Sequence, residues 1–251
     1  MVGYNTVTVN KEWSIFSVNF ESVAGNALTI QEAFPVQEGM TKGMTIADAD
    51  QIQVLKDGGG YKTYFLSNGK YMQMKVEKYD AAIDGKWRDA EVSARTPADA
   101  PLAPGQAFWY KAISFDTPYT LSVAGAVPGD PSSKIIIDKD WCHIGNPYPF
   151  ALSLNDDIGC REGMTKGMTI ADADQIQIPK DEGGYKTYFL SNGKYMQMKV
   201  EKYDAAIDGK WRDAEVSART PSDAKIPVGQ GAWYKRAGSA EFEFVILNPI
   251  K

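Results

Sequence analysis

The sequence predicts an all-β protein made of two tandem homologous domains, each sandwich-like or barrel-like. Three observations support this class: a long internal repeat, short alternating segments joined by Gly, Asn and Asp, and an abundance of rings, with thirteen Tyr, ten Phe and six Trp. Aromatic side chains suit a pleated, half-buried surface. Many short strands joined by tight turns are typical of sandwiches and barrels.

The internal repeat is the strongest of these signals. Residues 38–97 reappear as residues 162–221, with substitutions only at Val54, Leu55 and Gly58. The match continues upstream, where residues 7–13 resemble residues 135–141 with a slightly larger offset. The six tryptophans fall into three corresponding pairs, which are Trp13 with Trp141, Trp87 with Trp211, and Trp109 with Trp233.

The repeat also sets the domain boundaries. Val127–Ser133 is rich in Pro, Gly and Ser, a composition typical of a connection between domains. We therefore expect one β module over residues 1–127 and a second over residues 128–251. A copy of about 120 residues is long enough to bury a core of its own.

Turn signals predict the elements of one copy. Three Gly-containing segments, Asp57–Gly60, Asn68-Gly69 and Asp84-Gly85, predict hairpin turns, because Asn, Asp and Gly tolerate the positive φ that tight turns need. Short helices are expected at residues 29–34 and 45–50.

One strand has a clear two-faced pattern. Met72, Met74 and Val76 alternate with Gln73, Lys75 and Glu77, as in a strand with one solvated side. We therefore expect the apolar stripe to be buried, together with its counterparts Met196, Met198 and Val200.

The sequence lacks the residues of a familiar active site. His143 is the only histidine, and the corresponding residue of the first copy is Ile15. A Ser-His-Asp or Cys-His site would have to use it, so a structural role is the stronger interpretation. Acidic residues such as Asp84 recur in both copies, but their spacing is not that of a calcium loop. We expect no catalytic residue, no metal and no cofactor, with calcium binding and acid–base catalysis as minor alternatives.

The two cysteines, Cys142 and Cys160, both lie in the second copy. Because neither has a cysteine counterpart in the first copy, their joint presence favours a disulfide. Such a bridge would stabilise the domain by about 3 kcal/mol in the chain-entropy model and would fit an oxidising compartment. Two buried free thiols are the alternative.

Aromatic residues are the candidates for a ligand-binding surface. Trp87, Tyr79 and Tyr61 could stack against sugars, although rings of this kind more often fill a core. The full set of candidate ligand-binding residues is Tyr61, Tyr79, Trp87, Tyr185, Tyr203 and Trp211.

Two short motifs resemble those of a known group of proteins. Trp141–Pro149 is similar to the W-x-x-x-G-N-P-Y-P opening of β modules in secreted bacterial surface proteins, and Val228–Tyr234 resembles their P-G-Q-G-F-W ending. In the first copy, Pro104–Trp109 keeps the ending while the opening has diverged. The resemblance implies a β module of the cell surface or extracellular space and assigns no functional residue.

Composition narrows the function further. The net charge is −5 and no basic run stands out, which argues against a nucleic-acid partner. No apolar stretch reaches the ~18 residues of a membrane span, and the first residues do not resemble a signal peptide. We expect a non-catalytic structural or adhesive module, self-assembling or bound to a repeating surface partner. A carbohydrate-binding module is the alternative.

Overall fold

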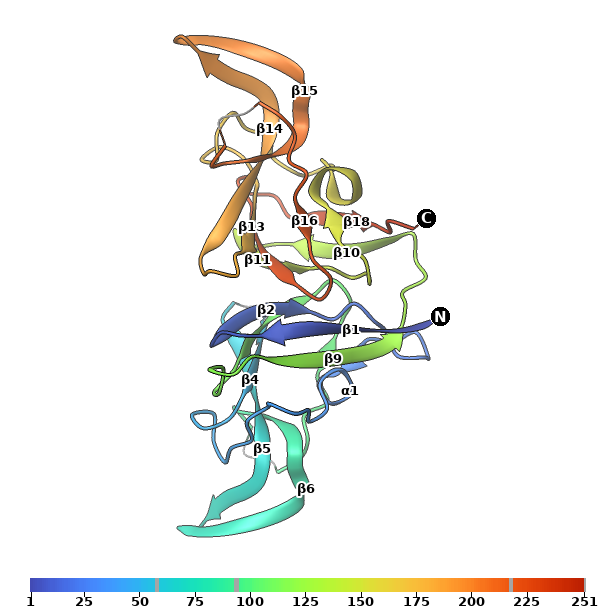
Figure 1. The fold of residues 1–251 in the computed structure, drawn as a ribbon, viewed down its shortest axis with the longest axis vertical. Helices are drawn as coiled ribbons and strands as arrows, with labels where there is room; N and C mark the ends of the chain where they lie inside the picture. Colours follow the sequence, from blue (N-terminus) through green and yellow to red (C-terminus); the bar gives the residue numbers. More distant parts are fainter. Residues whose placement is uncertain (57–58, 93–94, 217–218, 251) are drawn as a thin grey trace.

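The computed structural model describes residues 1–56, 59–92, 95–216 and 219–250. It is nearly all-β, with 51% of residues in strands and 4% in helices, so the predicted fold class is confirmed. Two five-stranded antiparallel sheets dominate, one from each copy of the repeat (Figure 1).

The two large sheets have the same strand order. The first runs β2-β8-β4-β5-β6 and the second runs β11-β17-β13-β14-β15. The strands of the first sheet are β2 (Trp13–Ser17), β4 (Gln51–Leu55), β5 (Tyr61–Gln73), β6 (Val76–Asp89) and β8 (Ala107–Lys111). Those of the second are β11 (Trp141–Gly145), β13 (Gln175–Pro179), β14 (Tyr185–Gln197), β15 (Val200–Asp213) and β17 (Gly231–Lys235).

Two-stranded ribbons and one short helix cover the inner face of each large sheet. In the first copy these are β1 (Val2–Val9) with β9 (Tyr119–Ala126), β3 (Leu28–Thr29) with β7 (Pro101–Leu102), and α1 (Ile30–Ala33). In the second they are β10 (Ser132–Ile137) with β18 (Phe242–Leu247), β12 (Leu152–Ser153) with β16 (Lys225–Ile226), and the π-helix η1 (Leu154–Ile158). Each copy is therefore a layered, sandwich-like unit.

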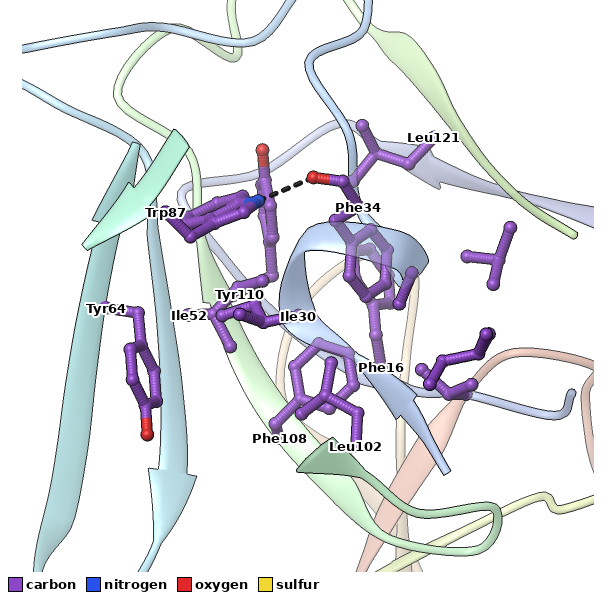
Figure 2. Packing of buried hydrophobic residues seen from close by; sticks show 14 of the residues in the cluster. Phe16, Ile30, Phe34, Ile52, Tyr64, Trp87, Leu102, Phe108, Tyr110 and Leu121 are labelled. Atoms are coloured by element: carbon purple, nitrogen blue, oxygen red, sulfur yellow. Dashed lines mark hydrogen bonds between the residues drawn. The ribbon is translucent and has the colours of Figure 1, made fainter. Parts of the chain in front are cut away.

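The core of each copy lies between these layers. In the first copy Trp87 is fully buried, and its indole N–H donates to the Phe34 carbonyl at 2.5 Å (Figure 2). Tyr110 of β8 packs against its ring, and Phe108 of the same strand packs against Phe34. In the second copy Trp211 repeats this arrangement by donating to the Gly159 carbonyl at 3.0 Å. Each of these cores therefore draws on the residues of one copy of the repeat.

The helix predictions had mixed outcomes. The helix expected at residues 29–34 is present as α1, and Thr29 and Glu32 cap it reciprocally in a capping box. The helix expected at residues 45–50 is wrong. There the Asp48 carboxylate accepts hydrogen bonds from the backbone N–H groups of Thr45 and Met44, at 2.8 and 3.2 Å, and this local bonding favours a turn over a helix.

The hairpin predictions also need correction. Gly69 and Gly85 have the expected positive φ, but they lie inside β5 and β6, next to register shifts in the ladder. They are β-bulge residues, which need the same backbone conformation as a turn. The chain reverses at Met74 and Lys75, whose φ values are 50° and 64°. The Asp57–Gly60 signal does separate paired strands, β4 and β5, but Asp57 and Gly58 lie outside the described residues.

Candidate binding surfaces

Two long hairpins, β5–β6 and β14–β15, project from opposite ends of the molecule (Figure 1). Met72, Met74 and Val76 at the first tip are 54%, 93% and 58% exposed. The counterparts Met196, Met198 and Val200 are 53%, 93% and 57% exposed. The predicted stripe is wrong in two ways. The chain reverses at Met74 and Lys75, so Met72 and Val76 belong to different strands, and the hairpins run past the layers that cover the large sheets. Each tip is thus an apolar surface that the chain itself leaves open.

A polar cluster braces each hairpin at its bulges. The Tyr79 hydroxyl donates to Asp84 at 2.9 Å, and Lys42 donates to the same carboxylate at 2.8 Å. These hydrogen bonds, first that of Lys42, hold the pKa of Asp84 below its usual range. Tyr79 also lies where a side chain on Gly69 would collide, since a Cβ there would come within 2.5 Å of its ring. The predicted ligand-binding Tyr79 is therefore half exposed and braces its own hairpin, and Tyr203 does the same with Asp208.

The two copies meet at a seam with approximate twofold symmetry. The Ser17 N–H donates to the Gly229 carbonyl at 2.8 Å, and its counterpart Gly145 donates to the Gly105 carbonyl at 2.7 Å. Lysines repeat the pattern. Lys11 reaches the Lys180 carbonyl at 3.2 Å, and Lys139 reaches the Lys56 carbonyl at 2.8 Å. The two copies thus contact each other through equivalent residues, as two subunits do in the isologous interface of a C₂ dimer.

Glycines let the two backbones approach closely at the seam. A Cβ on Gly145 would lie 2.4 Å from the Cβ of Ser17. A Cβ on Gly231 would lie 2.5 Å from the Cβ of Ala107. Both glycines belong to the segments that resemble the G-N-P-Y-P and P-G-Q-G-F-W motifs. In this chain those motifs therefore build the contact between copies.

Four tryptophans form a ladder across this seam. The ring centroids of Trp13 and Trp109 are 5.9 Å apart, those of Trp109 and Trp233 are 6.1 Å apart, and those of Trp233 and Trp141 are 5.8 Å apart. Lysines lie over the two outer rings, Lys111 over Trp13 and Lys235 over Trp141. The centre of the ladder lies where the two copies meet.

His143 is buried beside this ladder. Its ring centroid lies 4.1 Å from that of Trp233 and 5.8 Å from that of Tyr61. Burial lowers its pKa to about 4, and neither ring nitrogen has a hydrogen-bond partner in the part of the chain that the structure describes. A neutral imidazole without a positioned carboxylate or nucleophile is suited to packing rather than to acid–base chemistry.

Two clefts flank the seam at twofold-related positions. The larger, about 660 Å³, lies between β1 and β2 of the first copy and the β13–β14 turn of the second, and its walls include Trp13, Trp109 and Tyr185. The smaller, about 290 Å³, lies between the β10–β11 region and the first copy, and His143 lines it. The larger cleft is hereafter the Trp13 cleft and the smaller the His143 cleft.

The six aromatic residues predicted as ligand-binding are not brought together. Trp87 and Trp211 are fully buried and offer no ring face to a ligand. Tyr79 and Tyr203 lie on the hairpins, and only Tyr185 lines the Trp13 cleft. The ladder tryptophans were missed as site residues, although the pairing of all six tryptophans in the sequence already singled them out.

The predicted Cys142–Cys160 disulfide is absent, since both cysteines are free thiols. The Cys142 thiol is directed at the Lys139 carbonyl, with 3.6 Å between the atoms, whereas Cys160 lies beside Gly209 of β15. Both side chains pack against the second core, and burial raises the pKa of each thiol. The open alternative of two packed thiols therefore describes this structure.

The buried carboxylate Asp50 has a structural role. It accepts hydrogen bonds from the Tyr110 hydroxyl at 2.7 Å and from the backbone N–H groups of Ile113 and Thr41 at 2.8 and 3.0 Å. Asp174 is held in the same way in the second copy. Within residues 1–56, 59–92, 95–216 and 219–250, no group of three or more His, Cys, Asp or Glu side chains is placed to hold a metal ion. None of the helices described there is long and apolar enough to cross a membrane.

Comparisons with known proteins add no relative. The chain matches no protein-family model, no curated protein and no solved structure.

Proposed function

We propose that this protein is a non-catalytic assembly or adhesion module of the cell surface or extracellular space that acts through its two equal hairpins. One observation carries the proposal. The tips of β5–β6 and β14–β15 expose the same apolar side chains at opposite ends of one chain. Contiguous exposed apolar surface is typical of protein–protein contact sites. Two such ends on one molecule make it bivalent.

The outer strands of the hairpins suit pairing with a second molecule. β6 and β15 are the edge strands of their sheets, and an edge strand presents unpaired N–H and C=O groups to a partner. If β6 paired antiparallel with β15 of another molecule about Tyr79 and Tyr203, Lys78 would lie opposite Asp204. The same register would place Asp80 opposite Lys202. Opposite charges at facing positions stabilise such a ladder.

The positions of the hairpins favour an open assembly. A contact between unlike ends leaves one free end on each molecule, so it continues into a fibre unless the rotation closes a ring. The extracellular or surface location rests on the resemblance of Trp141–Pro149 and Val228–Tyr234 to motifs of secreted bacterial surface proteins. His143 is buried, and its ring nitrogens have no hydrogen-bond partner among the described residues, which supports a role without catalysis.

The proposal is tested by introducing charged side chains at the hairpin tips, where they do not disturb the cores. Met74→Lys with Val76→Lys alters the first hairpin, and Met198→Lys with Val200→Lys alters the second. Substitutions at such exposed positions usually change stability by under about 0.5 kcal/mol. Light scattering and electron microscopy over a concentration series should find assemblies of the wild-type chain. The variant that carries all four lysine substitutions should not form them. A wild-type chain that remains monomeric at high concentration would contradict the proposal.

A further inference from the structure

The Trp13 cleft has the size of a ligand site, and the proposed assembly through the hairpins makes no use of it. Its volume of about 660 Å³ lies inside the range of roughly 300–1,000 Å³ that is usual for pockets that bind small molecules. Both copies contribute walls, β1 and β2 from the first and the β13–β14 turn from the second. A ligand in it would therefore bind only when the two copies are joined as in this chain.

Aromatic rings and one orphaned hydroxyl line this cleft. Trp13 and Trp109, from neighbouring strands, and Tyr185, from the opposite wall, provide ring surface. An aromatic face carries partial negative charge and attracts the weakly positive C–H groups on the flat side of a pyranose ring. Ser14 also lines the cleft, is only 4% exposed, and has an Oγ without a hydrogen-bond partner in the described chain. Buried hydroxyls are nearly always satisfied, so an unpaired one beside this cleft is unusual.

The charges of the cleft favour an acidic ligand. Lys11, Lys180 and Lys225 line it against one carboxylate, Asp181, although the whole chain carries −5. Lys180 also contacts Glu215 at 3.3 Å outside the lining, whereas Lys225 is exposed. A local excess of lysine in an acidic protein concentrates anions at that place.

The His143 cleft, which is related to the Trp13 cleft by the approximate twofold symmetry, shows what the Trp13 cleft has that its counterpart lacks. In the His143 cleft, His143 and Cys142 occupy the places of Ile15 and Ser14, and the volume is about 290 Å³. The residues that line this cleft do not include Trp141, Trp233 or Tyr61, the counterparts of the three rings above. The imidazole packs against Trp233 instead of leaving that ring to a ligand. The two clefts therefore differ in volume and in the rings that line them.

From these observations we propose that the Trp13 cleft binds an acidic oligosaccharide, with pyranose rings on Trp13, Trp109 and Tyr185 and a carboxylate at the lysines. The site takes one oligosaccharide per chain, because the twofold-related cleft is smaller and lacks the three rings.

Isothermal titration calorimetry tests this with three probes: a galacturonic acid hexamer, a hyaluronan hexasaccharide and neutral chitohexaose. At least one acidic probe should bind with one site per chain, more tightly than the neutral one, and rising salt should weaken it. Tyr185→Ala and Trp13→Ala should each weaken binding at least about tenfold, a loss of about 1.4 kcal/mol. The matched variants Tyr61→Ala and Trp141→Ala should leave it unchanged.

Further variants keep the test decisive. Lys225→Glu alters an exposed side chain and should abolish the preference for acidic probes even if Trp13→Ala fails to fold. Lys11→Gln should weaken binding while Lys139→Gln does not. Binding of none of the probes, or equal losses from the two members of a matched pair, would overturn the site. Equal affinity for chitohexaose would overturn its acidic specificity. The lysine variants of the hairpin tips should bind normally, which separates this site from the proposed assembly.

Discussion

Gly231 of the second copy faces Ala107, its counterpart in the first copy, across the seam. A Cβ built on Gly231 would lie 2.5 Å from the Cβ of Ala107. The same Cβ would lie 2.4 Å from Cγ2 of Ile15. Ser17 and Gly145 form a second pair of this kind. In both pairs the first copy supplies a side chain and the second supplies a glycine. The surfaces are therefore complementary, and two first copies meeting in the same way would place alanine against alanine.

This relationship predicts the effect of a single methyl group. Gly231→Ala should destabilise the chain by about 1–3 kcal/mol, the usual cost of overpacking a close contact. Ala107→Gly should recover part of that loss when the two changes are combined, because it removes one of the two side-chain atoms that the new methyl meets. Chemical denaturation of the two single variants and the double variant measures the coupling.

The control for this prediction is Gly129→Ala, because a Cβ on Gly129 has nothing within 4 Å. This variant should unfold at the wild-type denaturant concentration. If Gly231→Ala were equally silent, or if Ala107→Gly added to its cost, the close approach of the two copies would be wrong.

His143 should make stability depend on pH. Burial holds its folded pKa at about 4 against an ordinary value of 6.5, so the unfolded chain binds the proton first. Its contribution is fully present above pH 6.5, decreases as the pH falls toward 4, and levels off below that. The shift corresponds to a loss of about 3 kcal/mol.

The matched variant for this prediction is His143→Ile, which installs the residue of the first copy. Urea denaturation at pH 7, 5.5 and 4.5 should give a flatter decline for the variant than for the wild type. Parallel declines of the two proteins would contradict a buried neutral imidazole.

The hairpin turns should tolerate, and gain from, better turn residues. Met74 and Lys75 have φ values of 50° and 64°, and the left-handed region costs a non-glycine residue about 1–2 kcal/mol. Asn-Gly prefers positive φ at both central positions of a tight turn. Replacing Met74-Lys75 by Asn-Gly should therefore raise stability by about 1 kcal/mol in a denaturation experiment.

The control places the same Asn-Gly pair two residues earlier, outside the turn. Asn-Gly at Met72-Gln73 lies within the paired part of β5, so it should not stabilise the chain and should weaken the strand. Stabilisation by the displaced pair instead would mean that the chain reverses elsewhere.

Replacement by phenylalanine should reduce stability more at a core tryptophan than at an outer tryptophan of the ladder. Trp87→Phe leaves a cavity and a buried Phe34 carbonyl without its donor, and such an unsatisfied group costs about 1–3 kcal/mol. Trp141 is 40% exposed, so Trp141→Phe should cost under about 1 kcal/mol. Thermal denaturation that ranks the two variants the other way would contradict the assignment of core and surface.

The fold class and the repeat could be predicted from the sequence. Strand and turn patterns are local, and the repeat is found by comparing the sequence with itself. The short helix at residues 29–34 was also predicted, and the capping box of Thr29 and Glu32 accounts for its start. Asn68-Gly69 misled because a bulge and a turn both require positive φ. Alternation at Met72, Met74 and Val76 also misled, because the chain reverses at Met74 and Lys75, and the ladder pairs Met72 with Glu77 and Gln73 with Val76.

The binding surfaces were less accessible to sequence reasoning, because they arise between copies. The Trp13 cleft combines Trp13 with Tyr185, and no spacing in the sequence indicates that these two residues meet. The asymmetry between the two clefts depends on Ile15 and His143, a difference visible in the alignment of the copies. Its meaning depends on Trp233, which only the fold places against the imidazole.

The most direct test of the central claim is sedimentation velocity of chains that keep one hairpin tip. If β5–β6 of one molecule pairs with β14–β15 of the next, a chain with Met74→Lys and Val76→Lys should cap growth at one end. Mixed in equal amounts with the matched variant carrying Met198→Lys and Val200→Lys, it should stop at dimers, while the wild-type chain continues to larger species. Assemblies of undiminished size from this mixture, or a wild-type chain that sediments only as a monomer, would contradict the account.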